Sequence, residues 1–400
     1  MNTFQTELER ELLLLRAQGL HRELRQVDSP QRSRIEVGGR VLLNFSSNDY
    51  LGLANHPALK EAAIHAIERY GAGAGASRLI CGSLAPHHEL ENALAAFKTS
   101  SAALAFSTGY AAAMGTICAL ADSNDVIILD KLVHASIVDA ARLSQAKLRV
   151  FRHNDLNHLE ELLRWAAQRE SVSANKRRVR VLVVTESVFS MDGDQASLRE
   201  IVGLKERYGA SLMVDEAHAT GLYGVNRRGL AEELGVAGRI EIQMGTLGKA
   251  LGAAGGFICG SRGLIDYLIN RARSFIFSTA PVPAAAAAAT AAIRLVQSEC
   301  GEQRRARLWQ LVSALRSCLE IGGPSRSAII PLHIGDESRA VATAAALRER
   351  GIFISAIRYP TVARGRARLR LTLTSDHSES DLEQVTTAVT QVNSSPSESH

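Results

Sequence analysis

Short apolar runs alternate with stretches of helical period from about residue 100 onward. The apolar runs predict buried strands at residues 102–106, 125–130, 148–151, 181–186, 211–215, 240–244 and 257–259. The stretches between them predict helices at 109–120, 136–143, 156–169, 198–208 and 264–273. Runs that are apolar throughout are typical of strands covered on both faces. The alternation therefore predicts an α/β fold with a mostly parallel central sheet and right-handed crossovers.

The two ends of the chain have different patterns. Residues 4–27 predict an amphipathic helix, and a hairpin follows with its turn at residues 38–39. An alanine-rich helix from 282 to 300 continues towards 319 and leads to a C-terminal α+β unit, with strands at 329–334, 352–355 and 368–373. We expect an N-terminal helix and hairpin segment at 1–47, a large domain at 48–285, a small domain at 286–392 and a disordered tail at 393–400.

Composition narrows the class of protein. Of 400 residues, 46% are hydrophobic and 22% charged, which is ordinary for a globular protein. The net charge of +5 suits an anionic substrate, but with 5% aromatic residues and no recognition motif it does not indicate nucleic-acid binding. Five scattered cysteines predict neither disulfides nor a metal site. The N-terminus lacks signal-peptide order and no run is long enough to cross a bilayer, so we expect a cytoplasmic protein.

Polar side chains gather where the predicted strands end. In an open parallel sheet, ligands bind beyond the carboxyl ends of the strands. The residues that follow successive strands are Thr108, Gly109 and Tyr110, then His134, Ser190, Asp215 with His218, and Thr246 with Lys249. Such clustering beside an apolar sheet predicts a binding site at this edge.

Lys249 lies in a glycine-rich loop directly after a predicted strand. Alone, such a loop is more often a solvated turn, but an aldehyde cofactor such as pyridoxal phosphate (PLP) binds to a lysine of this kind. Asp215 could then pair with the pyridine nitrogen, and His134 could stack on the ring. A helix start at residues 108–110 could bind the phosphate. Singly, each residue could equally be a helix cap or turn residue.

Two competing motifs have weaker support. Residues 71–76 fit the dinucleotide pattern GxGxxA, but a predicted helix precedes them where that fingerprint requires a strand, so a flexible glycine loop is favoured. Glu186 could belong to a metal site, although no further ligands follow at suitable spacing. We therefore expect no metal.

Several segments resemble the α-oxoamine synthases, which are fold-type I PLP enzymes. The similarity runs in order from about residue 18 to 390, and its main segments are 44–53, 134–136, 151–155, 185–194, 214–221, 246–256 and 368–374. It implies a large domain with a mostly parallel sheet and a smaller C-terminal α+β domain. It also implies an acyltransferase that joins an amino acid to an acyl thioester with loss of carbon dioxide.

The resemblance also implies roles for individual residues. Lys249 would be the Schiff-base lysine and Asp215 the partner of the pyridine nitrogen. His134 would lie on the ring, with His218 and Ser190 near its oxygen. The residues around the phosphate would be Thr108, Gly109, Tyr110 and Thr246, with Ser278 or Thr279 from a second subunit of a homodimer with shared active sites. The substrate would contact Arg358, Asn48 and Arg22.

The substrate pair stays open between branches of this family. Residues 275–280 and 355–362 favour L-alanine with a pimeloyl thioester, carried by coenzyme A or an acyl carrier protein. Tyr359 is shared with the branches that use glycine with acetyl-CoA or succinyl-CoA, and the stretch 222–224 favours the 5-aminolevulinate branch among them. A non-enzymatic, basic nucleic-acid-binding protein is the alternative from another class, and it would lack the colour of bound PLP.

Overall fold

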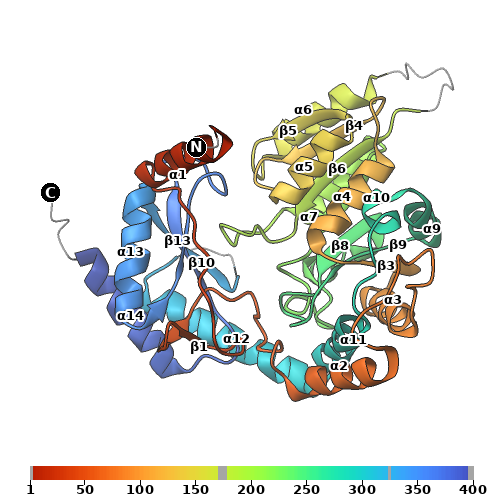
Figure 1. Cartoon of the computed structure of the whole chain (residues 1–400). Helices are drawn as coiled ribbons and strands as arrows, with labels where there is room; N and C mark the ends of the chain where they lie inside the picture. Colours follow the sequence, from red (N-terminus) through yellow and green to blue (C-terminus); the bar gives the residue numbers. More distant parts are fainter. Residues whose placement is uncertain (1–2, 170–177, 323–325, 395–400) are drawn as a thin grey trace. The chain divides into compact units, whose positions relative to one another are not determined.

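The computed structural model describes residues 3–169, 178–322 and 326–394, and the chain forms two compact units (Figure 1). Unit 1 contains Met1–Gly52, Met191–Gly193 and Ala306–His400, and unit 2 contains Leu53–Ser190 and Asp194–Arg305. The chain therefore passes from one unit to the other four times. The domain boundaries expected from the sequence stay predictions, and the expected tail lies outside the described residues from residue 395 onward.

Unit 2 is built on a seven-stranded sheet with the order β3-β9-β8-β7-β6-β4-β5. The strands are β3 (Ala102–Phe106), β4 (Val126–Asp130), β5 (Lys147–Phe151), β6 (Val181–Glu186), β7 (Ser211–Asp215), β8 (Ile242–Thr246) and β9 (Gly256–Gly260). Strands β4 to β8 are parallel, and β9 runs antiparallel to both β8 and β3. The predicted α/β fold with a mostly parallel sheet is confirmed.

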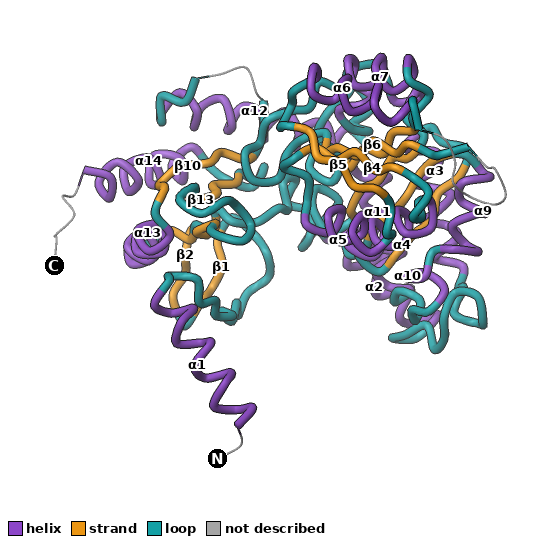
Figure 2. Tube along the Cα trace, turned by 90° about the horizontal axis from the view of Figure 1, so that it is seen from above, coloured by secondary structure: helices purple, strands orange, loops and turns teal. Residues whose placement is uncertain are grey.

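Helices cover both faces of this sheet, as Figure 2 shows. Helices α6 (Leu156–Ala167) and α7 (Leu198–Arg207) lie on one face, and α4 (Gly109–Leu120) and α5 (Ala135–Leu143) on the other. The other helices of the unit are α2 (Pro57–Tyr70), α3 (Ala85–Lys98), α8 (Leu230–Glu233), η1 (Ala237–Arg239), α9 (Arg262–Arg271), α10 (Arg273–Ile276) and α11 (Pro283–Gln297). Every residue of β3 and β4 is buried, as expected for strands covered on two sides.

Unit 1 contains two three-stranded sheets. One has the order β1-β2-β11, and the other β10-β13-β12. Their strands are β1 (Arg34–Val37), β2 (Arg40–Asn44), β10 (Ile329–Gly335), β11 (Ile352–Phe353), β12 (Ser355–Ile357) and β13 (Ala367–Thr372). Helices α13 (Glu337–Glu349) and α14 (Glu379–Ser394) belong to this unit, and α12 (Glu299–Cys318) enters it from unit 2.

Two expected helices are wrong in their bounds. Helix α1 is Thr3–Ala17 and does not reach residue 27, because Gly19 takes a positive φ of 66° that ends the helix. The long alanine-rich helix is broken at Ser298, whose extended backbone separates α11 from α12. No residue of α1 is buried, although it carries five leucines. Among the helices that the structure describes, none has the length and apolar character needed to cross a membrane.

Candidate active site

The loop after β8 presents Lys249 at the end of the unit 2 sheet. Leu247 donates its N–H to Gly255 O (2.9 Å), and Gly252 donates to Lys249 O (2.8 Å), so the loop is tightly closed. Gly252 has a φ of +60°, and a Cβ there would lie 2.5 Å from Ala54 N. The loop therefore needs glycine at this position. Lys249 Nζ lies 3.1 Å from His218 Nε2, so the two predicted site residues are in contact.

Asp215 ends the neighbouring strand β7 and is buried, with 6% of its surface exposed. Its Oδ1 accepts a hydrogen bond from Ala217 N (2.9 Å). Burial raises the pKa of Asp215, and the positive charge of Lys249 opposes this shift. The site thus holds a buried carboxylate within electrostatic reach of an amine, an arrangement suited to a cationic heterocycle.

Glu186 ends strand β6 beside Asp215, its partner in the parallel register. Its Oε2 accepts the backbone N–H of Ser190 (3.1 Å), and its carboxyl also accepts the backbone N–H of His134. Burial, reinforced by the charge of Asp215, raises the pKa of Glu186 to about 8. Glu186 is therefore largely protonated at neutral pH. By accepting both backbone N–H groups, it links the segment of His134 to the segment of Ser190, two predicted site residues.

His134 caps helix α5 and lies near the same charges. Its Nδ1 accepts a hydrogen bond from Ser136 N (3.3 Å). Burial lowers the pKa of His134, and Asp215 and Lys249 act on it in opposite directions. A neutral imidazole can pack against an aromatic ring without the cost of desolvating a charge.

A second cluster lies at the start of α4. Thr108 is the N-cap, and its side chain accepts from Ala111 N (3.0 Å). A Cβ on Gly109 would lie 4.0 Å from Thr246 Oγ1, so the end of β8 meets the helix start. A Cβ on Gly256 would come within 2.6 Å of Gly109 N, which shows how closely the backbones approach. Unpaired N–H groups at a helix start together with a threonine hydroxyl suit a phosphate.

A buried ion pair holds the residue that directly follows β7. Lys98 Nζ donates to Glu216 Oε2 (2.6 Å) and to Thr220 Oγ1 (3.2 Å), and both charged side chains are 1% exposed. The other carboxylate oxygen of Glu216 accepts Ala231 N (2.9 Å). Glu216 follows Asp215 directly, so this pair fixes the chain between Asp215 and His218. No pattern in the sequence around Lys98 indicates this pair.

Ser278 and Thr279 lie beside the glycine-rich loop of residues 71–83. Thr279 forms an isolated β-bridge with Ser77, and Ala280 donates its N–H to Ala76 O (3.0 Å). Close by in sequence, Phe277 is 70% exposed and Val282 46%. The predicted contact of Ser278 or Thr279 with the phosphate in a partner subunit stays a prediction.

The three predicted substrate-binding residues all lie in unit 1. Arg358 donates to His21 O, and Arg22 donates to Tyr359 O (3.0 Å). Burial is the main cause that lowers the pKa of Arg358, and the positive charges of Arg22 and Arg25 lower it further. These neighbouring guanidinium groups suit an anion.

Asn48 has a different partner within unit 1. Its Oδ1 accepts hydrogen bonds from Arg370 Nη1 (3.0 Å) and from Tyr50 Oη (3.2 Å). Arg370 is 6% exposed and was not identified from the sequence, although it lies in the segment 368–374. Two donors on the carbonyl oxygen leave the Asn48 amide N–H groups to point elsewhere. In the part of the chain that the structure describes, no group of three or more acidic, histidine or cysteine side chains could hold a metal ion.

Comparisons with known proteins fit this arrangement. Residues 40–389 match the family described as aminotransferase class I and II. The chain belongs to this family. Within the aminotransferase family it is 48% identical over 396 residues to 8-amino-7-oxononanoate synthase of Geotalea daltonii, with 98% of both chains covered. It is 52% identical over 389 residues to the enzyme of that name from Anaeromyxobacter sp. (strain Fw109-5), covering 96% of this chain and 95% of that one.

Solved structures extend the same similarity. Serine palmitoyltransferase of Sphingomonas wittichii has a TM-score of 0.88 and 31% identity, covering 98% of this chain and 97% of that one. A serine palmitoyltransferase from S. paucimobilis with a bound PLP–myriocin aldimine has a TM-score of 0.88 and 29% identity, covering 97% and 96%. The 8-amino-7-oxononanoate synthase of Francisella tularensis has a TM-score of 0.72 and 28% identity, covering 88% and 97%. The resemblance to the α-oxoamine synthases is confirmed.

Proposed function

We propose that this chain is a PLP-dependent acyltransferase of biotin biosynthesis. It condenses L-alanine with a pimeloyl thioester of coenzyme A or an acyl carrier protein, and it releases carbon dioxide, the free thiol and 8-amino-7-oxononanoate. The observation that carries the proposal is the 48% identity to a synthase of this name over 98% of both chains. The contact of Lys249 with His218 beside the buried Asp215 supports it.

The residues of unit 2 fit PLP by their chemistry. A lysine amine, a buried carboxylate, and a helix start with an adjacent hydroxyl match the aldehyde, the pyridine nitrogen and the phosphate of the cofactor. One carboxyl oxygen of the neighbouring Glu186, Oε1, is buried without a hydrogen-bond partner among the described residues. When bound, PLP would supply an electron-accepting ring that stabilises negative charge on the substrate Cα.

Each side chain then has a defined task. Lys249 would hold the cofactor covalently, and its amine would remove and return the proton at the substrate Cα. Asp215 would keep a proton on the pyridine nitrogen by pairing with it. His134 would lie against the ring, and His218 and Ser190 would donate to its phenolic oxygen. The phosphate would be held by Thr108, Gly109, Tyr110 and Thr246.

The substrate contacts follow from the resemblance and from unit 1. We propose that Arg358 and Asn48 bind the amino-acid carboxylate and that Arg22 binds the acyl substrate. The hydrogen bond from Arg370 to Asn48 supports adding Arg370 to the carboxylate-binding group. Because this carboxylate is later lost as carbon dioxide, these residues would act through orientation rather than proton transfer.

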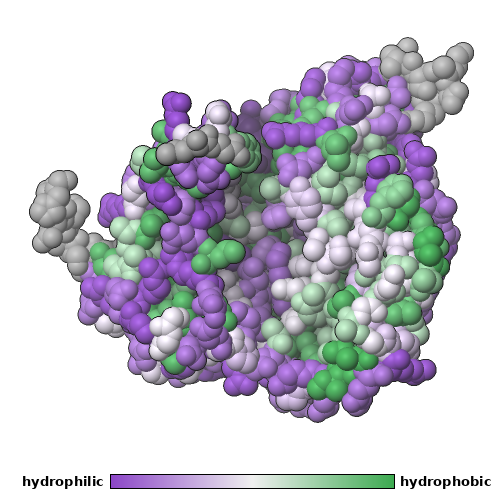
Figure 3. All heavy atoms as spheres, viewed as in Figure 1, coloured by the Kyte–Doolittle hydropathy of each residue, from purple (hydrophilic) through white to green (hydrophobic). Residues whose placement is uncertain are grey.

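We also propose a homodimer in which Ser278 or Thr279 reaches the partner's phosphate site. Figure 3 shows hydrophobic surface over the α9 and α10 side of unit 2. Near these helices, Ile80 is 78% exposed and Phe277 70%, and both flank the bridged segments described above. An apolar surface beside two hydroxyl residues suits an interface that completes a site. Mixing the Lys249→Ala and Thr279→Ala variants tests this, because shared sites would restore activity in part of the mixed dimers.

The function is tested with purified protein and separate substrates. Incubation with L-alanine and pimeloyl-CoA or the pimeloyl carrier protein should yield 8-amino-7-oxononanoate by mass spectrometry, and Lys249→Ala should abolish it. Lys60→Ala, on the exposed face of α2, is the matched control and should keep full turnover. Product from glycine with acetyl-CoA or succinyl-CoA alone would favour the branch indicated by Tyr359. Salt-dependent nucleic-acid binding without PLP uptake would refute both the pimeloyl reaction and the glycine reactions.

A further inference from the structure

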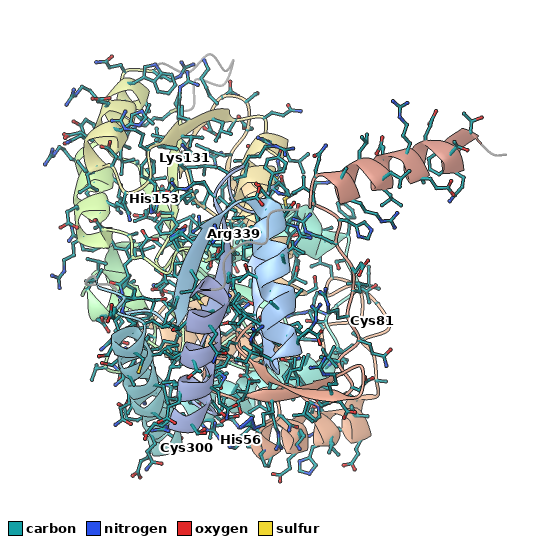
Figure 4. The ribbon with its side chains drawn as sticks, turned by 90° about the vertical axis from the view of Figure 1, so that its left-hand side faces the viewer. His56, Cys81, Lys131, His153, Cys300 and Arg339 are labelled. Atoms are coloured by element: carbon teal, nitrogen blue, oxygen red, sulfur yellow. The ribbon has the colours of Figure 1, made fainter. Side chains whose placement is uncertain are left out.

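His153 lies between two carboxylates outside the group of predicted cofactor contacts. Its Nδ1 is 2.9 Å from Asp130 Oδ1, and its Nε2 is 2.7 Å from Asp194 Oδ2. The ring packs edge-on against Phe189 with centroids 4.4 Å apart. Figure 4 labels His153 near Lys131, the residue that follows Asp130. Both ring nitrogens thus face acceptors, and neither faces a donor.

This geometry requires a cation. A neutral imidazole has one N–H and one acceptor nitrogen, so it can satisfy only one of two carboxylates. Burial would lower the pKa of His153, but the hydrogen bonds and charges of Asp130 and Asp194 outweigh it and raise the pKa to about 10. Asn154 completes the cluster by donating its backbone N–H to Asp130 Oδ2 (3.0 Å) and its amide to Asp194 Oδ2 (3.1 Å).

The two carboxylates belong to the segments that carry predicted cofactor contacts. Asp130 ends β4 four residues before His134, and its Oδ1 also accepts Leu132 N (2.8 Å). Asp194 follows Ser190 by four residues, and its carbonyl oxygen accepts Phe189 N (2.9 Å). The imidazolium is therefore a charged link between the two segments.

We propose that His153 is a positioning residue that fixes the distance between His134 and Ser190 around the cofactor. The inference rests on the proposed function, because these two residues contact the ring only if PLP binds there. Asp130 has a side chain that is 0% exposed, so removing the imidazolium leaves a buried carboxylate without its cation. The segments then separate or take up water, and the contacts on either side of the ring lose their alignment.

The test compares three variants with the parent protein. His153→Phe keeps an aromatic ring beside Phe189 but has no donors, whereas His153→Arg keeps a cation with several donors. His65→Phe, at an exposed position on α2, is the matched control. For each protein, PLP is titrated into the cofactor-free form to obtain Kd. The circular dichroism of the bound cofactor is recorded at saturation, and the melting temperature of the cofactor-free form is measured separately.

We expect His153→Phe to weaken PLP binding by about 10- to 100-fold, by analogy with the range found for residues that orient metal ligands. Its cofactor circular dichroism should fall even at saturating PLP, which a loss of general stability would not cause. His153→Arg should recover most of both signals, and His65→Phe should match the parent. Should His153→Phe fail to fold, Asp194→Asn provides the second variant, because it weakens one link at a side chain that is 35% exposed.

The outcomes separate this inference from the proposed function. If the parent protein takes up no PLP, the proposed function is refuted. If the parent binds PLP and both His153→Phe and Asp194→Asn match it in Kd and in cofactor circular dichroism, only the positioning role is refuted. Reduced binding in His153→Phe that His153→Arg does not restore would show that the imidazolium is not the active feature, and this too would overturn the inference.

Discussion

Replacing Glu186 with glutamine should stabilise the cofactor-free protein, and increasingly so as the pH rises. Glu186 is 2% exposed, and burial beside Asp215 raises its pKa from 4.5 to about 8. A carboxyl whose pKa is higher in the folded than in the unfolded state binds a proton on folding. Its contribution to stability is complete below pH 4.5 and is lost as the pH rises through 8. Glutamine has no proton to gain, and its amide oxygen can still accept the N–H groups of Ser190 and His134.

The size of the effect follows from the width of this interval. Each pKa unit corresponds to about 1.4 kcal/mol, so the advantage of Glu186→Gln over the parent should grow by about 1.4 kcal/mol per pH unit between 4.5 and 8. It should level off above that at a total on the order of 5 kcal/mol. The slope is the sharper prediction, since the constant part also includes changes in hydrogen bonding.

Urea unfolding of the cofactor-free proteins at pH values from about 5 to about 9 measures this difference. Glu68→Gln, on the exposed face of α2, is the control and should follow the parent at every pH. A difference between Glu186→Gln and the parent that stays constant over the whole range would refute the argument. It would mean that Glu186 does not change its protonation on folding.

Three further predictions follow from contacts in the two units. Lys98→Met should cost about 3–5 kcal/mol of unfolding free energy because it strands the buried Glu216 carboxylate, and urea unfolding showing a loss below about 1 kcal/mol would contradict this. Gly256→Ala places a Cβ 2.6 Å from the backbone at the start of α4, so it should lower the free energy of unfolding by about 1–3 kcal/mol. It should also weaken PLP binding in a spectroscopic titration, and an unchanged Kd would count against the phosphate site. Arg370→Lys should raise the KM for the amino acid about tenfold by weakening the contact with Asn48, with little change in the KM for the thioester, and equal effects on both would argue against a role in carboxylate binding.

The sheet and its polar edge could be predicted because both depend on local pattern. An apolar run of five or six residues predicts a buried strand wherever it pairs, and parallel strands end at the same edge. His134, Asp215 and Lys249 lie within electrostatic reach of one another at this edge, in the region where the sequence predicts the site. The starts of β8 and β9 differ from expectation by only one or two residues, as element ends commonly do.

Features that depend on distant partners could not be predicted. Lys98 ends an ordinary helix, and nothing in its surroundings indicates that it pairs with a residue 118 positions later. The same holds for His153, because its two carboxylates come from separate segments. The expected N-terminal helix is longer than α1 because Leu20 continues the apolar spacing of the helix. In the structure the backbone turns at Gly19, and Leu20 is buried outside the helix.

The parallel pairing of β11 with β2 affects how the chain must be assembled during synthesis. Leu43 and Asn44 pair with Ile352 and Phe353, and Ser46 accepts a bond from Ser355, 309 residues later. At about 5–20 residues per second, a ribosome needs about 15–60 s to make that distance. During this interval the β1–β2 hairpin leaves the ribosome while the edge of β2 that later pairs with β11 is still open, which makes that edge a natural site for chaperone binding.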